Sequence, residues 1–313
     1  MIHVRYAPSP TGDPHVGNLH TALFNWLFVK HFGGKFTLRI DDTDTNRNVP
    51  DGLDKILDSL AYLGMDFNDG PFFASDSLDS HRYAADKLVN SDNAYYCNCT
   101  NDALRIAREF AVSNRKAYKY NNHCRDLGLR KTTDSVIRFK MPLDGVTKFH
   151  DMIYGDICFD NSLLEDFVIM KSNGYPTYHL ATVIDDNRMN ITHVMRANDW
   201  ISSTPKHICI YNALDYVLPN FVHLPLILDK DRKKLSKRSG DATSILWYRD
   251  NGYYPDAMIN FLALLGWSLD DKTTIISRAD LIKYFSLDRV RKSSSIFDTN
   301  KLDWINKKYS NMR

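Results

Sequence analysis

The chain has 313 residues, of which 43% are hydrophobic and 25% charged, and this composition is typical of a globular protein rather than a disordered, fibrous or disulfide-rich one. The length suggests about two domains, or one large domain with an insertion. Forty Lys and Arg residues against 38 Asp and Glu residues give a formal net charge of +2, which neither requires nor excludes a nucleic-acid partner, because binding needs only a local cluster of basic residues.

The N-terminal part of the chain predicts a βαβ unit and therefore a parallel sheet. Residues 2–8 are typical of a short strand, and Pro- and Gly-rich sequence follows them. From Gly17 to about Phe32 apolar residues recur at helical spacing, and Phe36–Ile40 predicts a second strand that leads to Asp41. Two further helices are predicted at about 51–64 and 79–90.

The middle of the chain reads as an insertion between two halves of an α/β sheet. Residues 95–125 carry three of the five cysteines, and short β-like runs follow at 134–140, 146–150 and 166–171. Helix and strand then alternate again, at 177–186, 191–196 and 203–214. Beyond Gly240 the pattern is helical, at 244–251, 255–265, 278–284 and 300–308.

No segment of the sequence predicts a membrane span or an export signal. The apolar runs are all shorter than the roughly 20 residues that a membrane-spanning helix needs, and the sequence passes from Met1 directly into the first predicted strand. Five cysteines are too few for a disulfide scaffold in a chain of this length, and we expect them to be reduced. These features predict a soluble, cytoplasmic protein.

The loop between the first strand and the first helix is a candidate phosphate site. Within Pro8–Asn18, Gly17 allows a close approach of backbone or ligand, and His15 can donate a hydrogen bond to a phosphate at the helix N-terminus. The alternative is a rigid turn in which His15 only caps the helix.

A second candidate is the basic segment 229–240. Its six basic residues (Lys230, Arg232, Lys233, Lys234, Lys237 and Arg238) less its two acidic ones (Asp229 and Asp231) give a net charge of +4. Such a segment can be a solvated loop, or it can neutralise charge that develops on a phosphate in a transition state.

Together the two segments resemble the paired signatures of class I aminoacyl-tRNA synthetases. His15-Val-Gly-Asn18 is similar to the HIGH signature and Lys234-Leu-Ser-Lys-Arg238 to the KMSKS signature. Further strings, in the expected order and spacing over essentially the whole chain, narrow the resemblance to the glutamyl-tRNA synthetases. They are Ala7–Gly12 (APSPTG), Leu38–Asp44 (LRIDDTD), Tyr178–Ala181 (YHLA), Val194–Trp200 (VMRANDW), Ser202–Lys206 (SSTPK) and Phe297–Trp304 (FDTNKLDW).

The resemblance implies an α/β fold with a Rossmann-like parallel sheet, split by an α+β insertion and followed by a helical region. The expected domains are the first half of the catalytic domain (1–95), an acceptor-end-binding insertion with a candidate zinc knuckle (96–174), the second catalytic half with the KMSKS-like loop (175–239), and a helical stem-contact domain (240–313). Members of the family normally continue into an anticodon-binding domain, so we expect an engineered truncation or a natural short form.

The reaction implied by the resemblance joins L-glutamate to the 3′ end of tRNA(Glu) in two steps. ATP with Mg²⁺ forms glutamyl-adenylate and releases diphosphate, and transfer to the terminal ribose releases AMP. The protein contributes mainly positioning and electrostatic stabilisation, for which His15, Lys234 and Lys237 are the expected catalytic residues. The expected ATP-binding residues are Ser9, His15, Gly17, Asn18, Asp199, Lys234, Ser236 and Lys237; Asn18 stands in place of the second His of the signature.

Two arginines are the expected anchors for glutamate, because a guanidinium can bind a carboxylate through two parallel hydrogen bonds. By family position Arg196 binds the γ-carboxylate and Arg5 also lies at the glutamate, while Asp41 faces the ammonium group. For Arg5 the alternative is a salt bridge with Asp41 or Asp44. Ala7, Ser9, Tyr178, Thr182 and Trp200 complete the expected pocket, with Asp41 and Thr182 replacing the usual Glu and Asn.

The cysteine cluster Cys97, Cys99 and Cys124 suggests a structural zinc site, which needs a fourth ligand. By family position this ligand is Asp126; Tyr120 is the position used by a shorter relative, and His123 is the alternative on chemical grounds. The other alternative is a cysteine knuckle that binds no metal ion.

The expected partners are L-glutamate, ATP and the acceptor stem of tRNA(Glu), with no membrane partner, and the chain is expected to be monomeric. Two other functions compete with glutamate–tRNA ligation. One is that of the glutamyl-queuosine tRNA(Asp) synthetases, a short paralogous group, and the other is that of a non-catalytic tRNA-binding paralogue.

Overall fold

The βαβ unit predicted at the N-terminus is confirmed and forms one half of the central sheet. β1 (Ile2–Tyr6) pairs in parallel with β2 (Gly34–Ile40), and β2 pairs with β3 (Asp69–Phe73). α1 (Val16–Phe32) connects the first two strands. The computed structural model describes residues 1–235, 243–270 and 272–312.

The other half of the sheet has the order β7-β6-β10-β9. Its strands are β6 (Val146–Asp151), β7 (Gly155–Asp160), β9 (His193–Ala197) and β10 (Asn220–Leu224). β10 is parallel to both β9 and β6, and only β7 runs antiparallel. β6 and β7 thus extend the main sheet, although they come from the segment predicted as the insertion.

Helices flank the sheet and bury its apolar side chains. They are α2 (Gly52–Leu63), α3 (Leu78–Asn90), α5 (Tyr178–Arg188) and α6 (Thr204–Ala213). α1 is buried on most sides, because C-terminal helices cover the face that the strands leave open. Among the described residues, no helix is both long and apolar enough to cross a bilayer.

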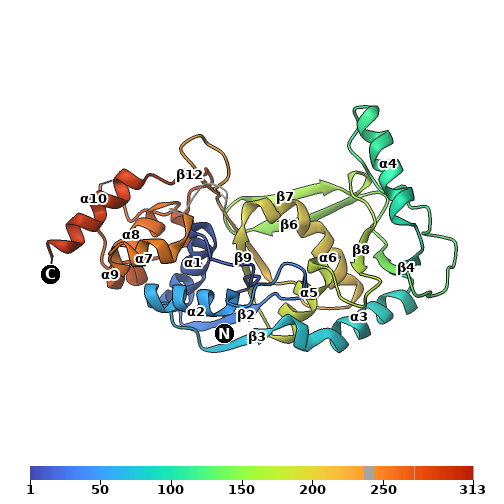
Figure 1. Ribbon diagram of the computed structural model, residues 1–313, viewed down its shortest axis with the longest axis horizontal. Coiled ribbons are helices and arrows are strands. Elements are labelled where there is room, and N and C mark those ends of the chain that lie inside the picture. Colours follow the sequence, from blue (N-terminus) through green and yellow to red (C-terminus); the bar gives the residue numbers. More distant parts are fainter. Residues whose placement is uncertain (236–242, 271, 313) are drawn as a thin grey trace.

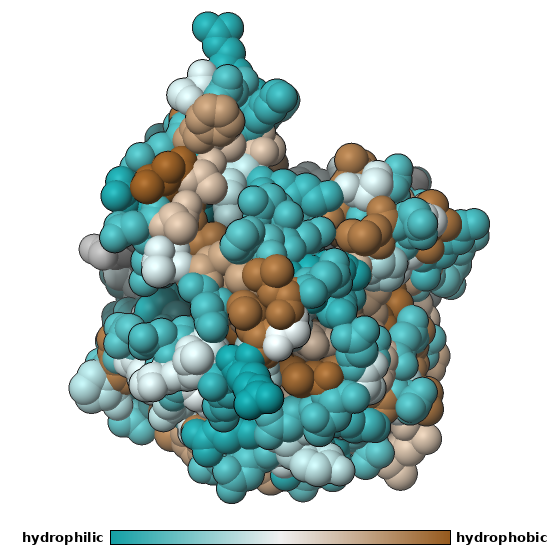
Figure 2. Space-filling model, turned by 90° about the vertical axis from the view of Figure 1, so that its right-hand side faces the viewer, coloured by the Kyte–Doolittle hydropathy of each residue, from teal (hydrophilic) through white to brown (hydrophobic). Residues whose placement is uncertain are grey.

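The insertion forms a separate antiparallel sheet at one end of the molecule (Figure 1). Its strands are β4 (Ala94–Cys97), β5 (Val136–Phe139) and β8 (Phe167–Met170). α4 (Asn101–Ser113) follows β4 and projects from this end, and none of its residues is buried. Figure 2 shows apolar side chains along this projection. Phe110 of α4 is exposed.

The C-terminal region is helical, as predicted, and lies at the opposite end of the molecule (Figure 1). Its helices are α7 (Ile245–Asp250), α8 (Pro255–Leu264), α9 (Arg278–Tyr284) and α10 (Thr299–Ser310). α8 packs against both α1 and α10, so the helical region shares one hydrophobic core with the N-terminal half of the sheet. A short parallel pair, β11 (Ile227–Leu228) and β12 (Ser295–Ile296), also joins the two regions.

Candidate active site and metal centre

β1 and β9 lie side by side where the two halves of the sheet meet. The backbone N–H of Thr192, just before β9, donates to the His3 carbonyl at 2.9 Å, and Arg5 Nη1 lies 3.5 Å from the Met195 carbonyl oxygen, so both strands run in the same direction. From this junction between β1 and β9 the strands follow one another outward in both directions, as β1-β2-β3 and as β9-β10-β6-β7. Parallel sheets bind ligands at the carboxyl ends of the strands at such a switch point. Arg5 lies on β1 and Arg196 on β9, on the two sides of the junction.

A buried ion-pair network holds Arg5 at this point. Arg5 Nε and Nη2 donate to the Asp186 carboxylate at 2.9 and 3.1 Å. Arg39 Nη1 donates to the same carboxylate at 2.6 Å, while its Nε donates to Asp41 at 2.7 Å and its Nη2 to the hydroxyl of Thr182 at 3.2 Å. Two guanidinium groups and two carboxylates are therefore held together by α5 and the first two strands.

The electrostatics of this network follow from burial and pairing. Burial acts to lower the pKa of Arg5 and to raise that of Asp186, but the opposite charges outweigh it, so the pKa of Arg5 is raised and that of Asp186 lies below its ordinary value of 3.8. For Asp41 burial outweighs Arg39, and its pKa is raised. Arg5 does form a salt bridge, as its alternative role required, but with Asp186: among the described residues Asp41 pairs with Arg39 and Asp44 with Arg47.

Arg196 is buried without such compensation. Its Nε lies 3.1 Å from His223 Nε2, its Nη1 lies 3.1 Å from His207 Nδ1, and its Nη2 donates to Thr204 Oγ1 at 2.9 Å. None of the ion pairs found among the described residues includes Arg196. Burial lowers the pKa of Arg196, because it outweighs the raising influence of Tyr178 and more distant charge.

Two aromatic side chains flank this guanidinium. The rings of Tyr178 and Trp200 lie 4.4 Å apart, and the guanidinium carbon of Arg196 is 5.8 Å from the centre of the Trp200 ring. Tyr178 begins α5, and Trp200 lies in the 3₁₀ helix Asn198–Ser203 that follows β9. The structure therefore brings together the predicted residues Arg196, Tyr178 and Trp200, with Arg5, Asp41 and Thr182 joined through the neighbouring network.

The loop before α1 is shaped by His15 and Gly17. His15 Nδ1 accepts a hydrogen bond from the backbone N–H of Gly17 at 3.0 Å, so His15 caps α1. This is the contact expected of a rigid turn, the alternative to a phosphate site. A Cβ at Gly17 would lie 2.8 Å from His15 Cε1, which means that any larger residue would displace the imidazole. Ala7 is partly buried, Ser9 is exposed, and the backbone N–H of Asn18 donates to the His15 carbonyl at 2.9 Å.

Lys234 of the basic segment and the residues that begin at Ser244 both contact parts of this region. Ser244 forms an isolated antiparallel bridge with His15, and the backbone N–H of Ile245 donates to the Pro14 carbonyl at 3.3 Å. Lys234, in the described part of the basic segment, forms an ion pair with Asp199, which follows β9. The predicted ATP-binding residues His15, Lys234 and Asp199 thus lie on segments that meet here, whereas Ser236 and Lys237 lie outside the described residues.

The three predicted cysteines form a group that could hold a metal ion. The sulfur atoms of Cys97, Cys99 and Cys124 all lie within 4.8 Å of one another. The Tyr120 hydroxyl is 3.5 Å from Cys97 Sγ and 3.6 Å from Cys99 Sγ. Asp126, the fourth ligand expected by family position, is not part of this group, and neither is His123; the structure places Tyr120 there instead.

Arg138 helps to stabilise the thiolate form of Cys97. Its Nε donates to Cys97 Sγ at 3.3 Å, and its guanidinium carbon lies 3.8 Å from the centre of the Tyr120 ring. Although burial acts to raise it, the pKa of Cys97 is lowered to about 7 by hydrogen bonds from Tyr120, the backbone and Arg138. Three converging thiols with a stabilised thiolate fit a soft or borderline metal ion such as zinc.

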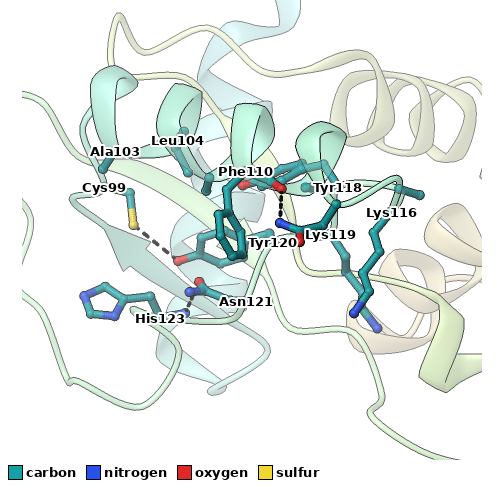
Figure 3. Close-up of a pocket in the computed structure, with 14 residues that line it drawn as sticks. Cys99, Ala103, Leu104, Phe110, Lys116, Tyr118, Lys119, Tyr120, Asn121 and His123 are labelled. Carbon is teal, nitrogen blue, oxygen red and sulfur yellow. Dashed lines mark hydrogen bonds between the residues drawn. The ribbon is translucent and has the colours of Figure 1, made fainter.

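A pocket of about 630 Å³ adjoins the cysteine cluster (Figure 3). Leu104 and Phe110 line it from α4, and Lys116, Lys119 and Tyr120 line it from the segment that follows. No motif in the sequence pointed to this pocket. Its lining combines apolar, aromatic and basic groups.

Known proteins resemble the chain along its whole length. The family model described as the catalytic domain of class I tRNA synthetases (E and Q) matches residues 1–304. A protein of Dehalococcoides mccartyi named glutamate–tRNA ligase is 51% identical over 316 residues, and one of Thermodesulfovibrio yellowstonii with the same name is 47% identical over 309. These matches cover 98% and 99% of this chain, which spans 65% and 66% of the length of those relatives.

Solved structures of similarly named proteins have the same fold as this chain. A glutamate tRNA ligase from Elizabethkingia meningosepticum, in complex with its amino acid, superposes with a TM-score of 0.92 at 36% identity and covers all of this chain and 70% of its own. The glutamate–tRNA synthetase of Elizabethkingia anophelis gives a TM-score of 0.93 at 36% identity, over all of this chain and 71% of its own. The chain therefore belongs to the class I tRNA synthetases of the glutamate and glutamine type and has the fold of their catalytic domain.

Proposed function

We propose that the chain joins L-glutamate to the 3′ end of tRNA(Glu) through glutamyl-adenylate, at the expense of ATP. The observation that carries this proposal is the buried guanidinium of Arg196, which no carboxylate of a described residue contacts and which lies beside Tyr178 and Trp200. A buried cation without a counter-ion favours a bound anion. The γ-carboxylate of glutamate supplies that anion, and its neutral amide analogue, glutamine, does not.

Each predicted residue has a place in this proposal. Arg196 binds the γ-carboxylate, Asp41 faces the ammonium group, and Arg5 supports the substrate from β1. Ala7, Ser9, Tyr178, Thr182 and Trp200 form the remaining walls. ATP, with Mg²⁺, occupies the loop before α1, where His15 and Lys234 stabilise charge on the phosphates together with Lys237. Ser9, Gly17, Asn18, Asp199 and Ser236 complete the ATP site.

The insertion is proposed to receive the acceptor end of the tRNA. The pocket beside α4 presents Phe110 and Tyr120 next to Lys116 and Lys119, and a basic groove with aromatic side chains is the combination that binds single-stranded nucleic acid. The boundaries of the insertion (96–174), the catalytic halves (1–95 and 175–239) and the stem-contact region (240–313) remain predictions, as do the monomeric state and the cytoplasmic location.

The proposed reaction is tested by isotope exchange between ATP and diphosphate. We expect exchange that depends on both glutamate and tRNA(Glu), since family members of this kind need tRNA for the activation step. Charging of tRNA(Glu) with labelled glutamate is the second readout. If glutamate were attached only to queuosine-containing tRNA(Asp), or if no exchange occurred with tRNA present, the proposal would be wrong.

Zinc is the metal that we propose for the cysteine cluster, where it would shape the insertion. Cys97, Cys99 and Cys124 would supply three thiolates and Tyr120 the fourth ligand. Plasma mass spectrometry of protein purified under reducing conditions should find about one zinc per chain, because thiolate sites of this kind bind zinc tightly. Absence of stoichiometric zinc would contradict this.

Matched cysteine variants make the zinc prediction specific. Cys99→Ser should lose most of the metal, whereas Cys158→Ser, at an exposed cysteine outside the cluster, should retain it. Tyr120→Phe and Asp126→Asn compare the two candidate fourth ligands. Weaker zinc retention against a chelator in the first variant alone assigns the ligand to Tyr120.

A further inference from the structure

A chain of buried polar side chains lies behind Arg196. Asp151, at the end of β6, is completely buried, and its Oδ2 lies 2.7 Å from His223 Nδ1 on β10. His223 Nε2 lies 3.1 Å from Arg196 Nε, and His207 on α6 continues the chain from Arg196 Nη1. His207 Nε2 in turn lies 3.0 Å from His179 Nδ1 on α5. Five side chains from five elements are thus linked in one line.

The hydrogen bonds fix the protonation state of His223. A guanidinium has only N–H donors, so the ring nitrogen that faces Arg196 Nε must be an unprotonated acceptor. The proton of the neutral imidazole is then on Nδ1, where it is donated to the Asp151 carboxylate. Burial lowers the pKa of His223, which agrees with a neutral ring.

The same argument applies to the opposite side of the guanidinium. His207 Nδ1 faces Arg196 Nη1 and must accept, so His207 carries its proton on Nε2 and donates it to His179. Thr204 Oγ1 accepts from Arg196 Nη2 and can donate to the Trp200 carbonyl at 3.2 Å. Acceptors on three sides therefore fix the plane of the guanidinium.

Asp151 anchors this arrangement to the backbone. Its Oδ1 accepts from the backbone N–H groups of Ile153 and Tyr154 at 3.0 and 2.9 Å, and its Oδ2 also accepts from the backbone N–H of His223 at 3.0 Å. The carboxylate cannot turn without breaking these bonds. Its negative charge reaches Arg196 only through the neutral imidazole of His223, so the guanidinium is oriented without being neutralised by direct contact.

We propose that His223, held by Asp151, is a positioning residue that aligns the Arg196 guanidinium for the γ-carboxylate of the amino acid. This inference rests on the proposed function and adds a residue that no signature of the sequence singled out. An orientation fixed before the substrate arrives reduces the cost of ordering the side chain on binding. A direct carboxylate partner would instead compete with the substrate for the same N–H groups.

Two substitutions at position 223 separate positioning of Arg196 from support of the fold. In His223→Gln the side-chain oxygen can reach the place of Nε2 and accept from Arg196, but the donor to Asp151 is lost. In His223→Asn the amide can replace Nδ1 and donate to Asp151, but the acceptor for Arg196 is lost. The asparagine variant should raise the KM for glutamate by about tenfold or more, the effect of losing one hydrogen bond to a charged group, with the KM for ATP within about twofold.

The glutamine variant should recover most of the affinity for glutamate. Equal glutamate KM values in the two variants, or a parallel rise of the KM for ATP and for glutamate, would overturn the proposal. If His223→Asn does not fold, Thr204→Val serves in its place, because it removes the acceptor of Arg196 Nη2 with little change in volume. An unchanged KM for glutamate in that variant would count equally against alignment of Arg196 by its buried acceptors.

A measurement without catalysis distinguishes failure of this inference from failure of the proposed function. In the unliganded wild-type chain, ¹⁵N NMR of the histidine rings, assigned by comparison with His223→Gln, should show His223 neutral with its proton on Nδ1 at pH 7. A proton on Nε2, or a doubly protonated ring, would overturn the positioning argument even in an active enzyme. The expected ring state together with no exchange in the wild-type chain would instead reject only the proposed reaction.

Discussion

Replacing Arg196 with Gln is expected to lower kcat/KM for glutamate by roughly 30-fold to several thousand-fold, while the KM for ATP stays nearly unchanged. Removal of one partner from a buried, hydrogen-bonded charge pair costs about 2–5 kcal/mol, and here the other partner is the substrate carboxylate. Exchange between ATP and diphosphate in the presence of tRNA(Glu), measured against glutamate concentration, provides the test.

The same substitution should cost little stability, which separates a binding role from a structural one. In the unliganded chain Arg196 is a buried cation without a carboxylate partner among the described residues. Its replacement relieves a desolvation cost, which offsets the hydrogen bonds lost to His223, His207 and Thr204. The melting temperature of Arg196→Gln should therefore stay within a few degrees of wild type. Arg82→Gln, at an exposed arginine of α3, is the matched control and should change neither property.

If Arg196→Gln bound glutamate normally, the assignment of the γ-carboxylate to Arg196 would be wrong. A large loss of stability together with lost activity would also count against it, because the arginine would then be acting as a structural element.

The sequence signatures predicted those site residues that lie within a short matched segment. His15, Arg196 and Trp200 lie in short segments that the family resemblance identified, and the structure brings Arg196 and Trp200 together. The strand–loop–helix pattern also predicted the βαβ unit, because its apolar periodicity extends over enough residues to distinguish helix from strand.

The partners of these residues carried no local signal. Asp186 is 181 positions from Arg5 and 147 from Arg39, and within its own helix it reads as an ordinary acidic residue. Only the packing of α5 against the two strands brings the three together. His223 and Asp151 were missed for the same reason, since they meet across β10 and β6.

Six strands (β3, β4, β7, β10, β11 and β12) and the helix α4 were not predicted. β3 contains Gly70 and Pro71, which are poor strand residues, and β11 and β12 have only two residues each. α4 had a usable signal, because Thr100 caps it and Leu104, Ala107 and Ala111 recur at helical spacing. The three cysteines of the same region favour a metal-binding knuckle, and this pattern competes with the helical one in the sequence.

Asp186 is where we expect the largest effect on stability. It neutralises Arg5 and part of the charge of Arg39, all three side chains being buried, and it ties α5 to β1 and β2. Asp186→Asn keeps the shape but leaves the buried guanidinium of Arg5 without its counter-ion. Breaking a buried ion pair from one side costs about 3–5 kcal/mol, so the melting temperature should fall by roughly 5–10 °C.

The pH dependence distinguishes lost charge from lost packing. Because the pKa of Asp186 in the folded chain lies below its ordinary value of 3.8, its ionised form stabilises the fold above about pH 4, and this contribution is lost as the pH falls through the lower folded-state value. The gap in melting temperature between wild type and Asp186→Asn should thus be full at pH 7 and narrow below pH 4. Asp79→Asn, at an exposed aspartate on α3, should show no gap at any pH. A gap of the same size at pH 7 and at pH 3.5 would contradict this assignment, because asparagine keeps the shape of the side chain and the charge of Asp186 is the property expected to change with pH.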